Sequence, residues 1–449
     1  MRSSIMLNIR LIIGLIVFFL PYTNSLVLNT GFPFKIYELL SIFLFSLLLL
    51  NLLMGKNLAV KIYKYEKQIY LALLVFFIWY CIVGIAGINN LNHTSTLAWA
   101  VGRHAPTISV ITKLFYFLFN IILFSLVIAY INNKGSLLKA VRIWIISSFV
   151  VSLYTVYLFI ASILNTHPFL LPGTQNLQCI DVPHLGTFIR NSTFKEGNLL
   201  GSYMTSSLLI TLPFLFIREK NINPFSSKIV SLVFFFQLFA LFISYSTINI
   251  LVFIISGLFF FKITYFEKPR IPKKPFYAIV LFGIVIVVFL FSQSGKLLFY
   301  QKLFGTDPFW SYSRKDRINM NLIALKMACD NPVFGVGPTN YGFYYNDYSI
   351  PSMRDTSFKR IAGNIYAEIL CESGIIGLVC YMSLIFLIIK IFIVKKKYIQ
   401  KNYMPVANAL FCGFIGMLTV FLAFPTFTLT FHWVLMGLLI SSIKALQIQ

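Results

Sequence analysis

The sequence predicts an all-α polytopic membrane protein with about 12 transmembrane helices, and three observations support this fold class. Of its 449 residues, 58% are apolar and only 11% are charged, for a mean hydropathy of +0.83, whereas roughly a quarter of a soluble domain is charged. Apolar runs long enough to cross a bilayer recur along the chain. Basic residues gather between alternate runs. Two hydrophilic segments interrupt the series, a large one at residues 294–372 and a smaller one at residues 165–197.

The apolar runs can be placed in order along the chain. The first covers residues 11–20 after Arg2 and Arg10, and with Pro21 behind it partly resembles a signal peptide. No small-x-small cleavage site follows it, so we expect a retained helix. Further spans are expected at residues 36–54, 69–88, 110–131, 141–164, 198–217, 229–246, 248–265, 276–293, 375–394, 404–423 and 426–443.

Lysine and arginine counts orient these spans, because short cytoplasmic loops are enriched in both residues. The segments on one side of the membrane hold 23 of the 37 basic residues, the short loops on the other side hold five, and the large hydrophilic segment holds nine. We therefore expect both termini in the cytoplasm and both hydrophilic segments outside it. Because topology accounts for the net charge of +24, that charge does not indicate a nucleic-acid partner.

This topology divides the chain into three parts. Residues 1–293 hold helices 1–9 and the extracytoplasmic loop 165–197, residues 294–374 form the large extracytoplasmic loop, and residues 375–449 hold helices 10–12. The six cysteines contain no CxxC pair, so a structural zinc site is not expected. Cys179 and Cys329 could form a disulfide if both loops are extracytoplasmic. P-loop, Asp-x-Asp, Gly-x-Ser-x-Gly and HExxH patterns are absent, which argues against the enzyme classes that use them.

The smaller loop ends in two basic residues immediately before a span. Arg190 and Lys195 would lie at the membrane surface, where the planar donor fork of an arginine suits a phosphate or diphosphate group. The alternative is that both side chains extend from the interface to water.

The large loop carries a predicted amphipathic helix at residues 316–329, with Ile318, Leu322, Leu325 and Cys329 on its apolar stripe. Arg314 and Arg317 lie one turn apart, and Asn321 shares a face with Arg317. The turn at residues 334–338 is glycine-rich, but it lacks the third glycine and the preceding strand of a dinucleotide fingerprint.

A second helical segment follows, in which Asn364, Glu368 and Glu372 recur every four residues and so share one face. Two neighbouring carboxylates near a membrane can act as acid or base, because low polarity and mutual repulsion raise the pKa of at least one of them. The alternatives are a solvated face or an ion pair with Arg360. The aromatic run from Tyr341 to Tyr348 could stack on sugar rings or form the core of the loop. His432, in the last span, is expected to be a structural histidine.

Three short patterns resemble the superfamily of O-antigen polymerases and O-antigen ligases. Residues 190–198 are similar to the family's Arg-x-Gly-Thr-Phe-x-x-Pro-Asn segment, and Arg190 precedes Gly201 as in the Arg-x10-Gly pattern of the polymerases. Residues 317–337 resemble Arg-x-x-x-Trp-x-x-Ala-Leu followed by Pro-Leu-Phe-Gly-x-Gly. Residues 364–366 and 372–378 resemble His-Asn-x-Tyr-Leu and Glu-x-Gly-x-x-Gly-Leu. Two departures stand out, because Gly363 replaces the histidine of the ligases and Asn321 replaces the tryptophan.

The resemblance implies a metal-independent, cofactor-free glycosyltransferase in the bacterial inner membrane, where it would join undecaprenyl-diphosphate-linked repeat units on the periplasmic face. We expect an O-antigen polymerase acting in lipopolysaccharide biosynthesis. A ligase that transfers polymer to the lipid A core is the alternative, and a polysaccharide transporter or flippase is a further one. The transporter is disfavoured because charge gathers in two outside loops rather than along mid-membrane helices. Membrane lipid and a chain-length regulator are the further partners considered.

The resemblance also assigns roles to residues. Arg190 and Arg317 would hold the donor diphosphate and stabilise its charge as it leaves. Glu372 or Glu368 would take the proton of the acceptor hydroxyl, with His184 as a weaker candidate base. The remaining substrate-binding candidates are Lys195, Arg314, Asn364, Tyr341 and Arg360.

Overall fold

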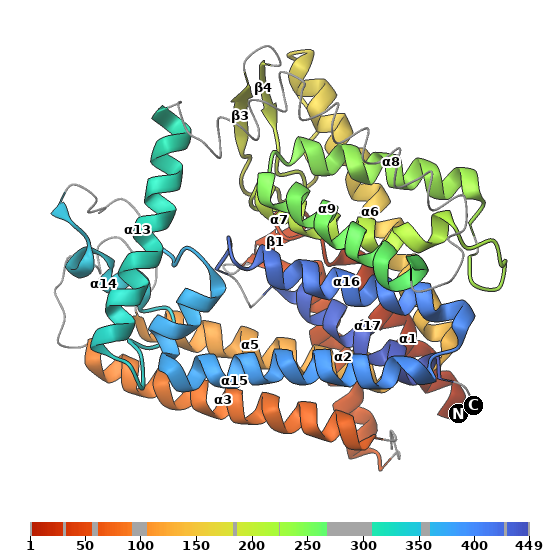
Figure 1. Cartoon of the computed structure of the whole chain (residues 1–449), viewed down its shortest axis with the longest axis horizontal. Coiled ribbons are helices and arrows are strands. Elements are labelled where there is room, and N and C mark those ends of the chain that lie inside the picture. Colours follow the sequence, from red (N-terminus) through yellow and green to blue (C-terminus); the bar gives the residue numbers. More distant parts are fainter. Residues whose placement is uncertain are drawn as a thin grey trace.

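Long apolar helices form the body of the protein in the computed structural model (Figure 1). It describes residues 2–29, 33–55, 62–91, 106–182, 186–223, 225–266, 308–351, 360–425 and 429–447. The helices in the first half of the chain are α1 (Arg2–Phe19), α2 (Ile36–Leu53), α3 (Lys64–Leu91), α5 (Pro106–Tyr130) and α6 (Lys134–Ile163). Those that follow are α7 (Gly197–Thr211), α8 (Ser227–Ile243), α9 (Thr247–Phe261), α15 (Ile365–Lys395), α16 (Met404–Val420) and α17 (Thr430–Ala445).

Seven stretches of the described chain are helical, long enough and apolar enough to cross a membrane. They are Ile36–Leu53, Lys64–Ile88, Thr107–Tyr130, Lys134–Ile163, Thr247–Phe266, Ile365–Tyr398 and Lys401–Val420. The predicted class, an all-α polytopic membrane protein, is therefore confirmed. The span expected at residues 276–293 lies outside the described residues, and the count of twelve spans stays a prediction.

The loops between the helices gather at two opposite ends of the bundle. At one end the guanidinium of Arg10 donates to the carbonyl oxygen of Tyr130 and to Asn132 Oδ1. The backbone of Gln400 donates there to the carbonyl of Leu446, beside the C-terminus. Figure 1 shows both chain ends on this side and the large loop on the other. Which end faces the cytoplasm stays a prediction.

Local sequence explains where several of these helices begin. Asn133 Oδ1 accepts a hydrogen bond from the backbone N–H of Ser136 and caps α6, and Ser226 Oγ accepts one from Ile229 at the start of α8. Asn364 Oδ1 accepts one from Ala367 N at 2.7 Å and starts α15. Asparagine and serine stabilise such positions because their side-chain oxygens satisfy the otherwise unpaired amides of the first turn.

Two short antiparallel hairpins accompany the helices. The pairs are β1 (Val27–Asn29) with β2 (Pro33–Lys35) and β3 (Cys179–Val182) with β4 (Gly186–Ile189). In the second pair Cys179 faces Ile189 and Val182 faces Gly186. The smaller hydrophilic segment thus contains a pair of antiparallel strands, and Arg190 directly follows β4.

The large loop contains α13 (Pro308–Asp330) and α14 (Tyr341–Tyr348), which share a small core with the first turns of α15. The predicted apolar stripe of α13 was wrong, because Ile318, Leu322 and Leu325 are between 47% and 53% exposed. The buried face instead includes Ala324 and Ala328. α13 packs on α15, and such short side chains allow two helices to approach closely.

Candidate functional site

Arg190 is held in place at the junction of β4 and α7. Its Nε donates to Gln178 Oε1 at 3.1 Å, and the same oxygen accepts the backbone N–H of Gly197 at 2.8 Å. A Cβ on Gly197 would lie 2.9 Å from Arg190 Cγ and 2.8 Å from the carbonyl oxygen of Ser244. Only glycine therefore lets the first turn of α7 pass beside the arginine, whose two terminal NH₂ groups have no hydrogen-bond partner among the described residues.

Arg317, from α13, comes close enough to Arg190 for the two charges to interact. Loss of hydration lowers the pKa of Arg190, Glu196 raises it, and the positive charge of Arg317 lowers it further. Partial loss of hydration also lowers the pKa of Arg317, while Glu196 and Asp316 raise it. Neither guanidinium lies within 4.0 Å of a described carboxylate. The two hydrophilic segments therefore bring together two cations that no carboxylate of the described residues neutralises by a direct ion pair.

The other basic candidates are placed less directly. Lys195 is exposed in the loop before α7, and Arg360 forms an ion pair with Asp316 at 2.9 Å. The side chain of Arg314 and the whole of His184 lie outside the part of the chain that the structure describes. Arg317 also lies over the ring of Phe424 at 5.6 Å.

The two departures from the family pattern touch each other. Asn364 Nδ2 donates to Asn321 Oδ1 at 3.0 Å, which joins the cap of α15 to α13. A Cβ on Gly363 would overlap the Asn321 amide, with the Asn321 Cγ atom at 2.8 Å. Asn321 thus occupies the space that a side chain at position 363 would need.

Glu368 and Glu372 lie beside Lys113 rather than Arg360, which was one expected partner. Lys113 Nζ lies 2.5 Å from Glu368 Oε1 and 2.6 Å from Glu372 Oε2. The Tyr80 hydroxyl donates to Glu372 Oε2 at 3.3 Å. Lys113 is not among the site residues expected from the sequence. Its position in an otherwise apolar helix was the available signal, because a lysine within a span is costly unless it is paired.

The glycine-rich turn at residues 332–337 packs directly against residues 371–375 of α15. Val336 N donates to the carbonyl of Cys371 at 2.8 Å, and Gly337 N donates to that of Glu372 at 3.0 Å. Ile375 N donates to the carbonyl of Pro332 at 2.9 Å. Gly374 breaks α15 at this point, with φ of 67° and ψ of −174°. The glycines of both motifs therefore serve backbone-to-backbone contact, and we call residues 332–337 and 371–375 together the backbone junction.

Tyr341 lies in the core of the large loop and is only 1% exposed. Its hydroxyl donates to the carbonyl of Met320 at 2.9 Å, and its ring contacts Tyr345 with centroids 6.0 Å apart. This placement favours the core-packing alternative over stacking on a sugar.

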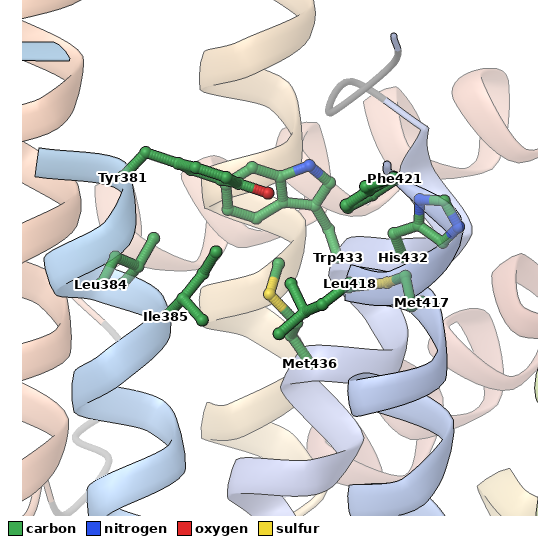
Figure 2. A pocket seen from close by; sticks show the side chains of 9 residues that line it. All are labelled: Tyr381, Leu384, Ile385, Met417, Leu418, Phe421, His432, Trp433 and Met436. Carbon is green, nitrogen blue, oxygen red and sulfur yellow. The ribbon is translucent and has the colours of Figure 1, made fainter. Parts of the chain in front are cut away.

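A small cavity of about 10 Å³ lies between α15, α16 and α17. Figure 2 shows Tyr381 and Trp433 at one side and His432 with Phe421 at another. His432 Nε2 lies 3.3 Å from Ser202 Oγ, and the ring packs edge-on against Phe421 with centroids 4.6 Å apart. The histidine is buried between helices, as expected for a structural residue.

Cys179 and Cys329, the two cysteines considered as a disulfide pair, are both exposed free thiols in the structure.

Comparison with known proteins finds a family domain in part of the chain. A family model described as O-antigen ligase matches residues 232–382, and no curated protein matches the chain. The matched segment includes Arg317, both halves of the backbone junction and the two carboxylates beside Lys113, whereas Arg190 precedes it. The resemblance that the motifs indicated is therefore confirmed for residues 232–382, which carry an O-antigen ligase family domain, and the chain is a multi-pass bacterial membrane protein.

Proposed function

We propose that this protein is an O-antigen polymerase, which joins undecaprenyl-diphosphate-linked repeat units on the periplasmic face of the inner membrane. The observation that supports the proposal most is the approach of Arg190 and Arg317, two cations from separate loops that form no direct ion pair with a described carboxylate. Placing like charges together costs free energy unless an anion joins them. A diphosphate, with several oxygens and two or more charges, fits a pair of guanidinium groups.

The same pair would assist the reaction itself. The bond from the donor sugar to the diphosphate breaks as the acceptor hydroxyl attacks, and negative charge accumulates on the departing lipid diphosphate. Donors placed beforehand beside that charge stabilise the transition state. In this proposal the arginines supply the positive charge without a metal ion. Lys195, which is exposed and follows Arg190 in the same loop, adds to the positive electrostatic potential around the site.

Gly363 favours polymerase over ligase. Ligases of this superfamily resemble this chain but carry a histidine at that position, and here Asn321 fills the space of any side chain. A polymerase adds the growing chain to a second lipid-linked repeat unit, whereas a ligase adds it to the lipid A core. The base that activates the acceptor is proposed among Glu372, Glu368 and His184.

The proposed orientation follows from the basic residues. The basic residues favour cytoplasmic termini, and with that orientation the arginine pair would face the periplasm. Lipid-linked donors are the form in which activated sugars reach that compartment, so the proposed site and substrate agree.

Deletion of the gene tests the proposal. A polymerase deletion should leave lipopolysaccharide capped with a single repeat unit, because ligation continues. Complementation with Arg317→Ala should fail, while Lys315→Ala, an exposed cation on the same helix, should restore long chains. Arg317→Lys should restore little, because an ammonium cannot make a bidentate contact.

Two outcomes would redirect the assignment. Loss of all O-antigen from the core, with lipid-linked polymer accumulating, would identify a ligase. Accumulation of single repeat units on the cytoplasmic face would identify a transporter.

A further inference from the structure

The carboxylate cluster formed by Lys113, Tyr80, Glu368 and Glu372 is built from three separate helices. α3 carries Tyr80, α5 carries Lys113, and the first segment of α15 carries both glutamates. These helices run side by side in Figure 1, and α3 packs against both others. The side chains of Lys113, Glu368 and Glu372 are 9%, 12% and 3% exposed.

The cluster carries an excess negative charge when its lysine, tyrosine and two glutamates are in their ordinary forms. Among these described side chains, one ammonium and a neutral phenol face two carboxylates, which leaves one negative charge in a nearly dry environment. An uncompensated buried charge is costly, and ionisable groups within membrane spans are usually functional. Uptake of one proton would bring the cluster to neutrality.

The two carboxylates differ in how they are held. Glu372 Oε2 receives both Lys113 Nζ at 2.6 Å and the Tyr80 hydroxyl at 3.3 Å. Glu368 uses only Oε1, which lies 2.5 Å from Lys113 Nζ. Glu368 Oε2 is buried and has no hydrogen-bond partner among the described residues. Glu368 therefore retains an acceptor oxygen, whereas Glu372 is fixed from two sides.

Glu368 also lies nearer the arginine pair along a continuous path of contacts. Arg317 and Asn321 are one turn apart on α13, and Asn321 accepts a hydrogen bond from Asn364. Glu368 follows Asn364 by one turn, and its own N–H donates to the Asn364 carbonyl at 3.0 Å. Glu372 lies a further turn away, next to the break at Gly374.

We propose, on the basis of the function proposed above, that Glu368 is the base of the transfer and that Lys113, Tyr80 and Glu372 are its positioning residues. Glu368 Oε2 takes the proton of the acceptor hydroxyl. The hydroxyl oxygen forms a bond to the anomeric carbon of the donor sugar, and the bond from that carbon to the diphosphate oxygen breaks. The electron pair leaves with the lipid diphosphate beside Arg190 and Arg317. The protonated Glu368, ionised Glu372 and Lys113 are then neutral together.

Kinetics of the full-length protein in membranes test the role of Glu368. The probe is the lipid-linked repeat unit extracted from a strain that lacks this gene. Glu368→Gln should reduce kcat by roughly 100-fold or more with the donor KM unchanged, as expected when a general base is lost. Glu372→Gln should reduce kcat less, because it removes a support rather than the proton acceptor.

The positioning role of Lys113 has its own test. Lys113→Met should reduce kcat strongly, since two carboxylates then face each other without a cation. The double variant Lys113→Met/Glu372→Gln removes one charge of each sign, and it should regain at least tenfold over Lys113→Met alone. A structural role alone predicts no such recovery at equal thermal stability.

A matched control exists at the opposite end of the bundle. Lys444 Nζ pairs with Glu66 Oε1 at 3.4 Å, with side chains 7% and 1% exposed. Lys444→Met should lower thermal stability as Lys113→Met does but leave kcat unchanged. If Lys444→Met reduces kcat as much as Lys113→Met, the effect is structural and the positioning role is refuted.

The outcomes separate this inference from the proposed function. Full kcat in Glu368→Gln, while Arg317→Ala still fails to use the donor, would overturn the assignment of the base and leave the polymerase intact. Normal donor use in both arginine variants would instead reject the diphosphate site. Activity lost in Glu372→Gln but kept in Glu368→Gln would exchange the roles of the two carboxylates.

Discussion

Replacement of Gly374 by alanine tests whether the backbone junction depends on close approach. The residue has φ of 67° and ψ of −174°, a region that is essentially restricted to glycine and costs roughly 1–3 kcal/mol for other residues. A Cβ there would overlap the carbonyl of Val333 and lie 2.9 Å from Phe334 N. Since these are backbone atoms, the turn at residues 332–337 must move.

The size of the effect follows from what that movement breaks. Three hydrogen bonds cross the junction, from Val336, Gly337 and Ile375, and each contributes about 0.5–1.5 kcal/mol. Together with the conformational strain, the loss is about 3–7 kcal/mol. We expect Gly374→Ala to lower the thermal midpoint markedly and to abolish activity, because the segment carrying Glu368 and Glu372 ends at this junction.

Tryptophan fluorescence of the detergent-purified protein measures the effect close to its origin. Trp79 stacks on Phe334 with ring centroids 5.4 Å apart, and its Nε1 donates to the Ser373 carbonyl at 2.8 Å. Gly55→Ala is the matched control, because Gly55 has φ of 66° but nothing within 4 Å of an added Cβ. That variant should cost only about 1 kcal/mol. Equal midpoints for the two variants would refute the reasoning.

Three further predictions follow from the site and the topology. Gly363→His should destabilise the protein and give no ligase activity, because the Asn321 amide fills the space beside residue 363. Adding Asn321→Ala should restore part of the thermal midpoint, and equal midpoints of the single and double variants would contradict this. Tyr341→Phe should cost about 1 kcal/mol through the lost bond to Met320 and leave repeat-unit polymerisation intact; lost activity at normal stability would indicate substrate contact. A periplasm-specific reporter fused after Asn340 should be active and one fused after Asn133 silent, and the reverse result would invert the proposed topology.

The motifs were recognisable from the sequence, but their physical roles were not. Residues 332–337 and 371–375 could be matched to the family separately. The structure brings them together as one junction, in which Gly335 and Gly374 allow backbone to meet backbone. Gly363 and Asn321 were noted as independent departures, and the structure makes them neighbours. Sequence patterns show which positions are unusual, whereas packing shows which unusual positions compensate one another.

Charge partners were the hardest feature to anticipate. Lys113 and Glu368 are 255 residues apart in sequence and form one of the shortest contacts described. Periodicity correctly placed Glu368 and Glu372 on one face of a helix, but it could not identify the helix that faces them. Likewise, the prediction for α13 chose the wrong face. Its large apolar residues Ile318, Leu322 and Leu325 are exposed, whereas the small residues Ala324 and Ala328 are buried.

The sequence by itself determined the class of the protein, the positions of most described helices and the concentration of polar groups in two loops. These follow from transfer of each segment between water and lipid, which depends on local composition. Only the tertiary structure decided that Arg190 meets Arg317 and that Lys113 lies between Glu368 and Glu372. Those contacts depend on which helices pack side by side, and distant segments acquire a common environment only when the bundle has formed.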